Sequence, residues 1–353
     1  MADYALRRLQ QVDVTGPVGA AQLMAGTIAG RAFTSGEVIV SGGQPTVVSI
    51  PLVNGTDRIG LLELDYDVWD GDLPAGWERF VAVFVRVLIT ESRYSDLWVR
   101  ARRSEPLSAA AEVQWDLLPP LSCSTAEIAI GGILEPAYEI GGDSFDYAVN
   151  GSRFEFAIVD AIGHGMSAVL MSAAAINSLR SARRSGIDLV SAYRQADELI
   201  ETRFGHSYYV TGQFGSLDLA TGVLTWLNAG HVLPMLVRNG SYVGELRCAP
   251  SMPLGLGGPV VEVATEPLQR GDRVLFYTDG ITESRSPDGA FFGRERLADF
   301  LVRAALEEVP IAETARRLSA SVIDYANSRL SDDATLLLIE YIGHHPQPQS
   351  QTG

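Results

Sequence analysis

The chain has 353 residues and a formal net charge of −16, with 46% hydrophobic and 20% charged residues. This length predicts two domains, and the composition is that of a globular protein with a sizeable core. The charge argues against nucleic acid and anionic membrane surfaces as partners, because both are bound by clustered Lys and Arg. Only two cysteines occur, and no apolar stretch reaches the about 20 residues that a membrane span needs. We therefore expect a cytoplasmic protein without a disulfide framework.

Residues 1–100 are expected to form a small α+β domain. Residues 38–40, 46–53 and 59–64 are rich in β-branched and aliphatic residues and predict strands. Between the last two, Asn54-Gly55 is a strong hairpin signal. From Trp77 to Leu97, apolar residues recur at helical spacing, which predicts one long helix.

Residues 101–121 are predicted to link two domains through a helix. The helix is expected to begin at Ser104 and to end at Pro119-Pro120, because proline disfavours helix at the preceding residue. An apolar stripe runs from Leu107 to Leu118. The stripe allows two interpretations, a helix that pairs with its copy in a homodimer or one that packs on its own domain, and the sequence favours neither.

Residues 122–342 are expected to form the second domain, and residues 343–353 a disordered polar tail. Runs of strands with the helices grouped apart from them favour an α+β fold over alternating βαβ units. Strands are predicted at 154–159, at 214–228 with a turn at 220–222, at 273–277 and at 335–342. Helices are predicted at 166–184, 189–203, 294–306 and 312–327.

Four aspartates lie where neighbouring strands would hold a carboxylate rigidly. Asp160, Asp279 and Asp332 each adjoin an apolar run, and Asp143 lies in a Gly-rich stretch just before one. Carboxylate oxygens are the ligands that hard cations such as Mg²⁺ and Mn²⁺ prefer. Since four carboxylates balance the charge of two divalent ions, the sequence predicts a site for two ions.

Five motifs follow one another in the second domain. They are Glu139-x-Gly-Gly-Asp143-x-x-Asp146, Asp160-x-x-Gly163-x-Gly165, Asn228-Ala229-Gly230-His231, Gly271-Asp272 with Tyr277-Thr278-Asp279-Gly280, and Asp332-Asp333-x-Thr335-Leu336. In this order they resemble the SpoIIE-type (RsbU/RsbP-like) branch of the metal-dependent PPM serine/threonine protein phosphatases. The resemblance extends over residues 111–341.

The resemblance implies an α-β-β-α sandwich with two Mn²⁺ or Mg²⁺ ions at one end of two stacked antiparallel sheets. Asp160 would bridge both ions and the Ala161 carbonyl would add an oxygen ligand. Asp143 would hold one ion, and Asp279 and Asp332 the other. Asp160 and Asp143 are accordingly the catalytic candidates. A water bridging two divalent ions is deprotonated near neutral pH, so phosphate-ester hydrolysis needs no protein nucleophile.

Several further polar residues have weaker interpretations. Asp146 and Asp333 could orient a metal ligand without binding the metal. His164 could protonate the leaving alkoxide, although a loop histidine is the simpler interpretation. His231 and Asp272 are expected to be structural.

Residues 20–100 carry two motifs, Ala29-Gly30-Arg31-Ala32-Phe33-x-x-Gly36 and Val48-x-Ile50-Pro51-Leu52-Val53-x-Gly55-x-x-x-Ile59-Gly60-Leu61-Leu62-Glu63-Leu64. Through these motifs the region resembles a GAF sensor domain. No histidine or cysteine precedes residue 120, so we expect no haem or linked chromophore there.

The phosphatase resemblance implies hydrolysis of phosphoserine or phosphothreonine. Its expected substrate is a phosphorylated STAS-domain anti-anti-sigma factor in a partner-switching pathway that controls a sigma factor. Two alternatives stay open, a non-catalytic phosphatase-like binding module in the same pathway and a phosphatase of small phosphate esters. The four retained aspartates argue against the binding module, because binding alone does not require a cluster of like charges.

Overall fold

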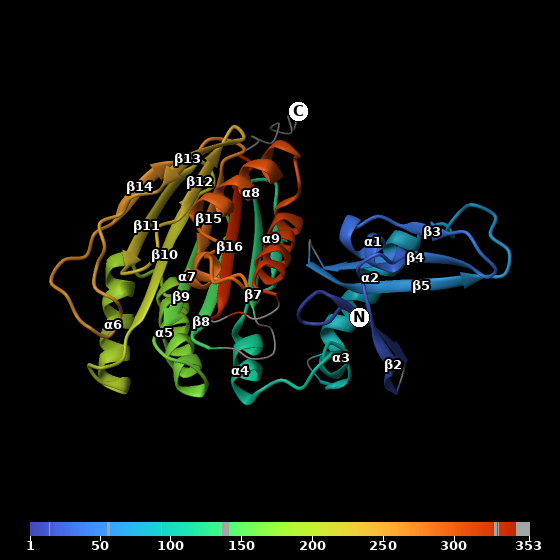
Figure 1. Ribbon diagram of the computed structural model, residues 1–353, viewed down its shortest axis with the longest axis horizontal. Helices are drawn as coiled ribbons and strands as arrows, with labels where there is room; N and C mark the ends of the chain where they lie inside the picture. The colour runs from blue at the N-terminus through green and yellow to red at the C-terminus, as the bar shows by residue number, and fades with distance from the viewer. Residues whose placement is uncertain are drawn as a thin grey trace, which may run out of the picture. The chain divides into compact units, whose positions relative to one another are not determined.

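The computed structural model describes residues 1–13, 15–54, 57–92, 94–135, 141–327, 330 and 332–343 (Figure 1). The chain divides into two compact units, Met1–Leu107 and Ser108–Gly353. The hairpin residue Gly55, the motif residue Glu139 and the predicted tail from 344 onward lie outside the described residues. Over the ranges given above, no helix is both long and apolar enough to cross a membrane.

The described residues of unit 1 form two small antiparallel sheets and three helices. Its elements are β1 (Arg8–Asp13), β2 (Gly16–Leu23), α1 (Ile28–Ser35), β3 (Ile39–Ser41), β4 (Thr46–Asn54), β5 (Asp57–Tyr66), α2 (Trp77–Glu91) and α3 (Leu97–Ala101). One sheet is β1-β2, and the other has the order β3-β4-β5. Apolar residues of β4 and β5 pack against one side of α2 to form the core of this unit. The likeness of this unit to a GAF domain stays a prediction.

Two features of unit 1 differ from the expectations. The β1–β2 hairpin was not predicted, because Gly, Ala and Gln dominate its strands and give no apolar alternation. The helix predicted to reach Leu97 ends at Glu91, and a short second helix begins at Leu97. The apolar spacing continues across this break, so spacing alone did not locate it.

Unit 2 contains two antiparallel sheets. The five-stranded sheet has the order β14-β11-β10-β9-β8 and the six-stranded sheet the order β13-β12-β15-β16-β7-β6. Their strands are β6 (Ser122–Ser124), β7 (Ile128–Glu135), β8 (Asp143–Asn150), β9 (Arg153–Ala161), β10 (Val210–Asp218), β11 (Val223–Ala229), β12 (Met235–Arg238), β13 (Ser241–Glu245), β14 (Ala264–Pro267), β15 (Arg273–Tyr277) and β16 (Ala334–Tyr341).

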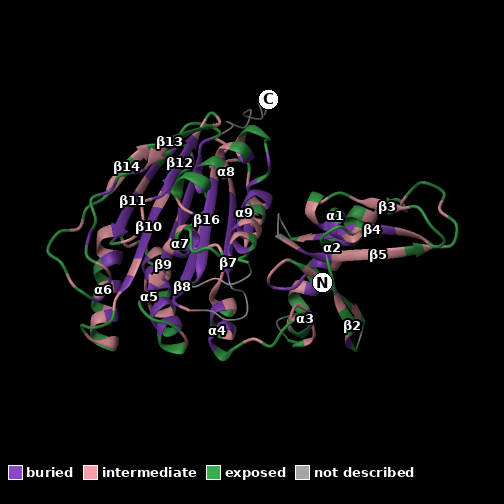
Figure 2. Ribbon diagram, in the orientation of Figure 1, coloured by how far each residue is buried: buried purple, intermediate pink, exposed green. Residues whose placement is uncertain are grey.

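The helices of unit 2 cover the outer faces of the two sheets. They are α4 (Ala109–Leu117), α5 (Met166–Arg184), α6 (Leu189–Phe204), α7 (Asp279–Glu283), α8 (Arg294–Leu306) and α9 (Ile311–Tyr325). Helices α5 and α6 pack on the five-stranded sheet, and α8 and α9 on the six-stranded sheet (Figure 1). The central strands are largely buried, whereas the edge strands β13 and β14 and the outer sides of the helices are exposed or half-buried (Figure 2).

The core between the sheets is made of aromatic and aliphatic side chains from both inner faces. Phe156 of β9 and Phe276 of β15 meet there, with ring centroids 4.3 Å apart. A second core lies between the five-stranded sheet and helices α5 and α6. A third lies between the six-stranded sheet and helices α8 and α9. The α+β class is therefore confirmed, and the layers of unit 2 follow the expected α-β-β-α order.

Helix α4 begins later than the sequence indicated. Its N-cap is Ser108, whose hydroxyl accepts a hydrogen bond of 3.1 Å from the amide of Ala111. The predicted start at Ser104 is wrong because Pro106 disfavours helix at the residue before it. The helix packs on α5 of its own unit and buries Gln114 completely. Pairing of this helix in a homodimer stays a prediction.

Candidate metal centre

Strands β8 and β9 place two of the four aspartates directly opposite each other. Asp143 is the first residue of β8 and Asp160 the last but one of β9, and they are register partners. Directly opposed residues of an antiparallel pair lie on the same face, where like charges repel. Asp143 is only 2% exposed, so water does little to relieve this repulsion.

The other two aspartates lie next to the paired strands β15 and β16, one just after β15 and one just before β16. Asp279 opens α7 just after β15, and Asp332 comes two residues before β16. The pairing of these strands extends past their ends, because the amide of Thr278 donates to the carbonyl of Thr335 at 3.0 Å. Asp279 is half-buried and Asp332 is exposed.

Hydrogen bonds tie the ends of the two sheets together. Asp333 accepts through one oxygen, Oδ2, from the amides of Gly141 at 2.6 Å and Asp143 at 3.3 Å. The hydroxyl of Thr278 donates to Oδ2 of Asp143 at 2.6 Å. Asp333 therefore orients the segment that carries Asp143, which agrees with the orienting role considered from the sequence.

The carboxylates raise one another's pKa values. Burial, and then Asp160 and Asp333, raise the pKa of Asp143 well above its ordinary value. Burial, followed by Asp279 and Asp332, raises the pKa of Asp160 to about 7. Every charged side chain that contributes to these two shifts is a carboxylate, and none is a cation. The negative charges of the cluster are therefore not balanced by one another.

The remaining acids of the cluster respond in the same way. Burial is the largest cause that raises the pKa of Asp333 to about 6, against the lowering effect of its two backbone hydrogen bonds. The pKa of Asp279 is raised by burial and then by the neighbouring Glu283. A raised carboxyl pKa means that the folded protein binds a proton at that group more tightly than usual. A metal cation placed at the same carboxylates would relieve the same repulsion.

The donor chemistry fits Mg²⁺ or Mn²⁺, which prefer clustered carboxylate oxygens. Over the described ranges, however, no three acidic, histidine or cysteine side chains converge as a ready-made metal-binding group. The structure thus brings Asp143, Asp160, Asp279 and Asp332 to one end of the sandwich and couples them electrostatically. Their assignment as ligands stays a prediction.

The backbone near Asp160 depends on a glycine. The amide of Ala161 donates to the carbonyl of Gly142 at 3.2 Å. A Cβ added at Gly142 would lie 2.1 Å from the carbonyl oxygen of Ala161. Only glycine lets the segment before β8 approach Ala161 this closely. The structure does not test whether the Ala161 carbonyl binds a metal.

The two candidate histidines differ in their surroundings. His164 lies exposed in the turn between β9 and α5. The ring of His231 lies between two partners, with Nε2 3.0 Å from the carbonyl of Tyr277 and Nδ1 2.9 Å from the hydroxyl of Thr211. Burial lowers the pKa of His231 to about 4. A neutral ring that donates from Nε2 satisfies both contacts, which supports the structural interpretation.

Asp272 is also structural. Its carboxylate forms an ion pair with Arg238, in which Nη2 and Oδ2 are 2.6 Å apart, and it is 1% exposed. It also accepts from the amide of Gln269 at 2.7 Å, as expected for a turn residue.

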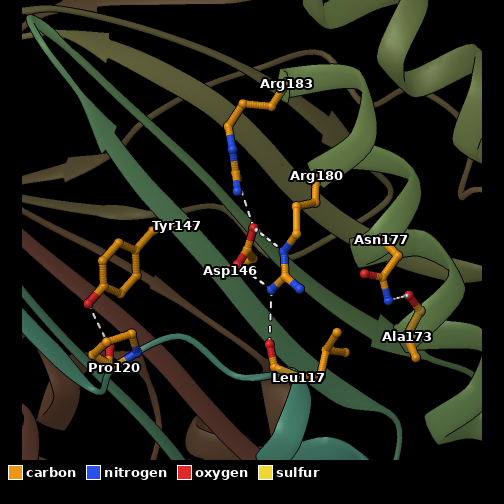
Figure 3. Close-up of polar contacts among 8 residues, drawn as sticks. All are labelled: Leu117, Pro120, Asp146, Tyr147, Ala173, Asn177, Arg180 and Arg183. Atoms are coloured by element: carbon orange, nitrogen blue, oxygen red, sulfur yellow. Dashed lines mark hydrogen bonds and ion pairs between the residues drawn. The ribbon is translucent and has the colours of Figure 1, made fainter. Parts of the chain in front are cut away.

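Asp146 is neutralised by arginines, unlike the cluster (Figure 3). Its carboxylate forms ion pairs with Arg180 at 2.6 Å and Arg183 at 2.8 Å, both from α5. Arg180 also donates to the carbonyl of Leu117 at the end of α4, at 2.9 Å. Next to Asp146, the hydroxyl of Tyr147 donates to the carbonyl of Pro120 at 2.6 Å. Asp146 therefore ties β8 to α5, Arg180 attaches the end of α4, and Tyr147 attaches the segment after it.

The sequence interpretation assigned no role to Thr278, although this residue is part of a quoted motif. A threonine before a strand-terminal aspartate has no distinctive spacing. Its role depends on Asp143, which lies 135 residues away in the chain, so no local signal could have identified it.

The fold and the carboxylates define the class of this protein. Residues 150–342, more than half of the chain, match the family model described as stage II sporulation protein E (SpoIIE). The chain belongs to this family and is a SpoIIE-type PPM phosphatase. The matched range contains Asp160, Asp279 and Asp332 and begins after Asp143.

Curated relatives and a solved structure agree with this membership. The chain is 22% identical over 262 residues to Protein IcfG of Synechocystis, covering 66% of this chain and 41% of that protein. It is 23% identical over 234 residues to the phosphoserine phosphatase RsbU of Bacillus subtilis, covering 66% of this chain and 69% of that protein. A Mycobacterium tuberculosis structure with RsbU and RsbW domains has a TM-score of 0.55 and 27% identity, covering 65% of this chain and 63% of that one.

Proposed function

We propose that the chain is a cytoplasmic, divalent-metal-dependent phosphatase of phosphoserine or phosphothreonine in proteins. The observation that carries the proposal is the cluster of carboxylates at one end of the sandwich, whose members raise one another's pKa values. Such a cluster destabilises the fold unless cations compensate it, so its presence in a compact domain points to a function that uses cations.

Asp143, Asp160, Asp279 and Asp332, with the carbonyl of Ala161, are the groups that would hold Mg²⁺ or Mn²⁺. The bound ions would supply Lewis acidity, activating a water molecule and neutralising phosphoryl oxygens. Asp333 holds the backbone amide of Asp143, and Thr278 holds its carboxylate, through the bonds described above. His164 is exposed and follows Asp160 by four residues, so it is the candidate to donate a proton to the leaving oxygen.

The proposed substrate is a phosphorylated STAS-domain anti-anti-sigma factor of the same cell. Membership in the SpoIIE family supports this choice, as does similarity to a relative named phosphoserine phosphatase RsbU. Dephosphorylation would let the anti-anti-sigma factor capture an anti-sigma kinase and release a sigma factor.

The test is phosphate release from that phosphorylated STAS protein, with Mn²⁺ and with chelator, by the wild-type chain and by Asp160→Asn. We expect release that requires Mn²⁺ and is at least 1,000-fold slower in the variant, a barrier increase of about 4 kcal/mol. Asp299→Asn is a matched control, because Asp299 is exposed on α8 outside the cluster.

The other outcomes separate the competing hypotheses. Binding of the phosphoprotein without metal-dependent release would favour a non-catalytic binding module. Faster hydrolysis of an aryl phosphate than of the phosphoprotein would favour a phosphatase of small esters. Activity of Asp160→Asn within about tenfold of wild type, a difference of only ~1.4 kcal/mol, would remove Asp160 from the catalytic site.

A further inference from the structure

The side chain of Thr278 lies at the junction of the two sheets and is not exposed at all. Its hydroxyl donates to Oδ2 of Asp143 at 2.6 Å and accepts from the amide of Thr335 at 3.0 Å. A second possible acceptor, the carbonyl of Thr335, is 3.5 Å away. Because a hydroxyl has one proton, the shorter contact shows that Asp143 receives it.

The orientation of this hydroxyl is fixed from both sides. The Thr335 amide occupies an acceptor position of the oxygen, so the proton is directed to Asp143. Thr335 is itself held by the backbone bond between the Thr278 amide and its carbonyl, at 3.0 Å. The hydroxyl of Thr335, by contrast, makes no hydrogen bond. Thr278 is thus the better-oriented of the two donors.

The hydrogen bond has a consequence for Asp143 as a ligand. It engages Oδ2 of the carboxylate and leaves Oδ1 as the oxygen available to a cation. A ligand kept in one rotamer binds a cation with less reorganisation.

We propose that Thr278 is a positioning residue that orients Asp143 for divalent-cation binding, linking the end of β15 to the start of β8. The inference rests on the proposed metal site. It assigns to Thr278 no contact with the metal or the substrate, only with the carboxylate that it orients.

The test measures Mn²⁺ binding directly, by titration calorimetry of the full chain without substrate. Thr278→Val keeps the shape of the side chain and removes the donor, and we expect its affinity for Mn²⁺ to fall at least tenfold, in the range seen when partners of metal ligands are removed. Thr278→Ser keeps the hydroxyl, and we expect its affinity to stay within about twofold of wild type.

Thr314→Val is the matched control for loss of a buried threonine hydroxyl. Thr314 is also fully buried, and its hydroxyl donates only to backbone carbonyls near the start of α9, at 3.1 and 3.2 Å. We expect this variant to lose stability without losing Mn²⁺ affinity. If Thr278→Val does not fold, Thr278→Ala replaces it, since alanine also removes the donor and adds no other polar group.

Two results would overturn the inference. One is wild-type Mn²⁺ affinity in a folded Thr278→Val or Thr278→Ala chain. The other is an equal loss in Thr278→Ser and Thr278→Val, which would show that the hydroxyl is not what matters. Failure of the metal site itself would look different, because wild type and Asp160→Asn would then bind Mn²⁺ equally weakly.

Discussion

Replacing Asp160 by asparagine should stabilise the metal-free protein, although it should abolish activity. The pKa of Asp160 is raised in the folded state from 3.8 to about 7. A raised carboxyl pKa means that stability is fully present below about pH 4 and is lost as the pH rises to 7. At pH 8 the ionised Asp160 therefore costs roughly 4 kcal/mol, whereas at pH 5 the folded protein holds this carboxyl protonated and the cost is less than half as large.

The assay is urea unfolding in chelator at both pH values, for wild type, Asp160→Asn and the exposed control Asp299→Asn. We expect Asp160→Asn to raise the free energy of unfolding by about 4 kcal/mol at pH 8 and by less than half of that at pH 5. In excess Mn²⁺, wild type should instead have the larger free energy of unfolding, because it gains binding energy that the variant lacks. An Asp160→Asn chain that is less stable than wild type without metal at pH 8 would refute the electrostatic coupling of the cluster.

Three further predictions concern other parts of unit 2. Asp279→Ala and Asp332→Ala should each raise the Mn²⁺ concentration needed for half-maximal phosphate release by about tenfold or more; an unchanged titration in both would exclude them as ligands. Because the pKa of His231 is lowered to about 4, its folded form resists protonation. Wild type should therefore lose about 3 kcal/mol relative to His231→Asn as the pH falls from 6.5 to 4, and parallel stability curves would contradict the neutral assignment. Leu118→Asp places a charge beside the core between the sheets and should lower the free energy of unfolding by roughly 2–4 kcal/mol; a sedimentation profile like that of wild type would argue against a dimer through this helix.

Much of unit 2 was predictable because its elements have strong local signals. The helices at 166–184 and 294–306 match the structure, and β15 was predicted at its observed bounds. Strand β8 was not among the predicted strands, because Asp143 and Asp146 interrupt its apolar pattern and are explained only by partners elsewhere in the chain. One partner is Thr278, and the other is the arginine pair of α5.

The candidate site shows the same limit. The four aspartates could be proposed from local context, but their arrangement depends on long-range pairing. The sequence does not reveal that Asp143 and Asp160 are opposite each other, because strand register is set by packing of both faces. The sequence also gives no sign that Asp146 has other partners than the four clustered aspartates. Only the fold places Arg180 and Arg183 against that carboxylate.

The attachment of α4 to α5 decides where the phosphatase unit can be cut from the chain. A chain starting at residue 122, as the sequence boundary suggests, would lack the Leu117 carbonyl that Arg180 binds and would uncover the side of α5 on which α4 packs. A chain starting at 105 would retain both, together with the Ser108 cap. Studies of the isolated catalytic unit should therefore treat α4 as its first helix, and a short fragment that aggregates or is inactive would say nothing about regulation by unit 1.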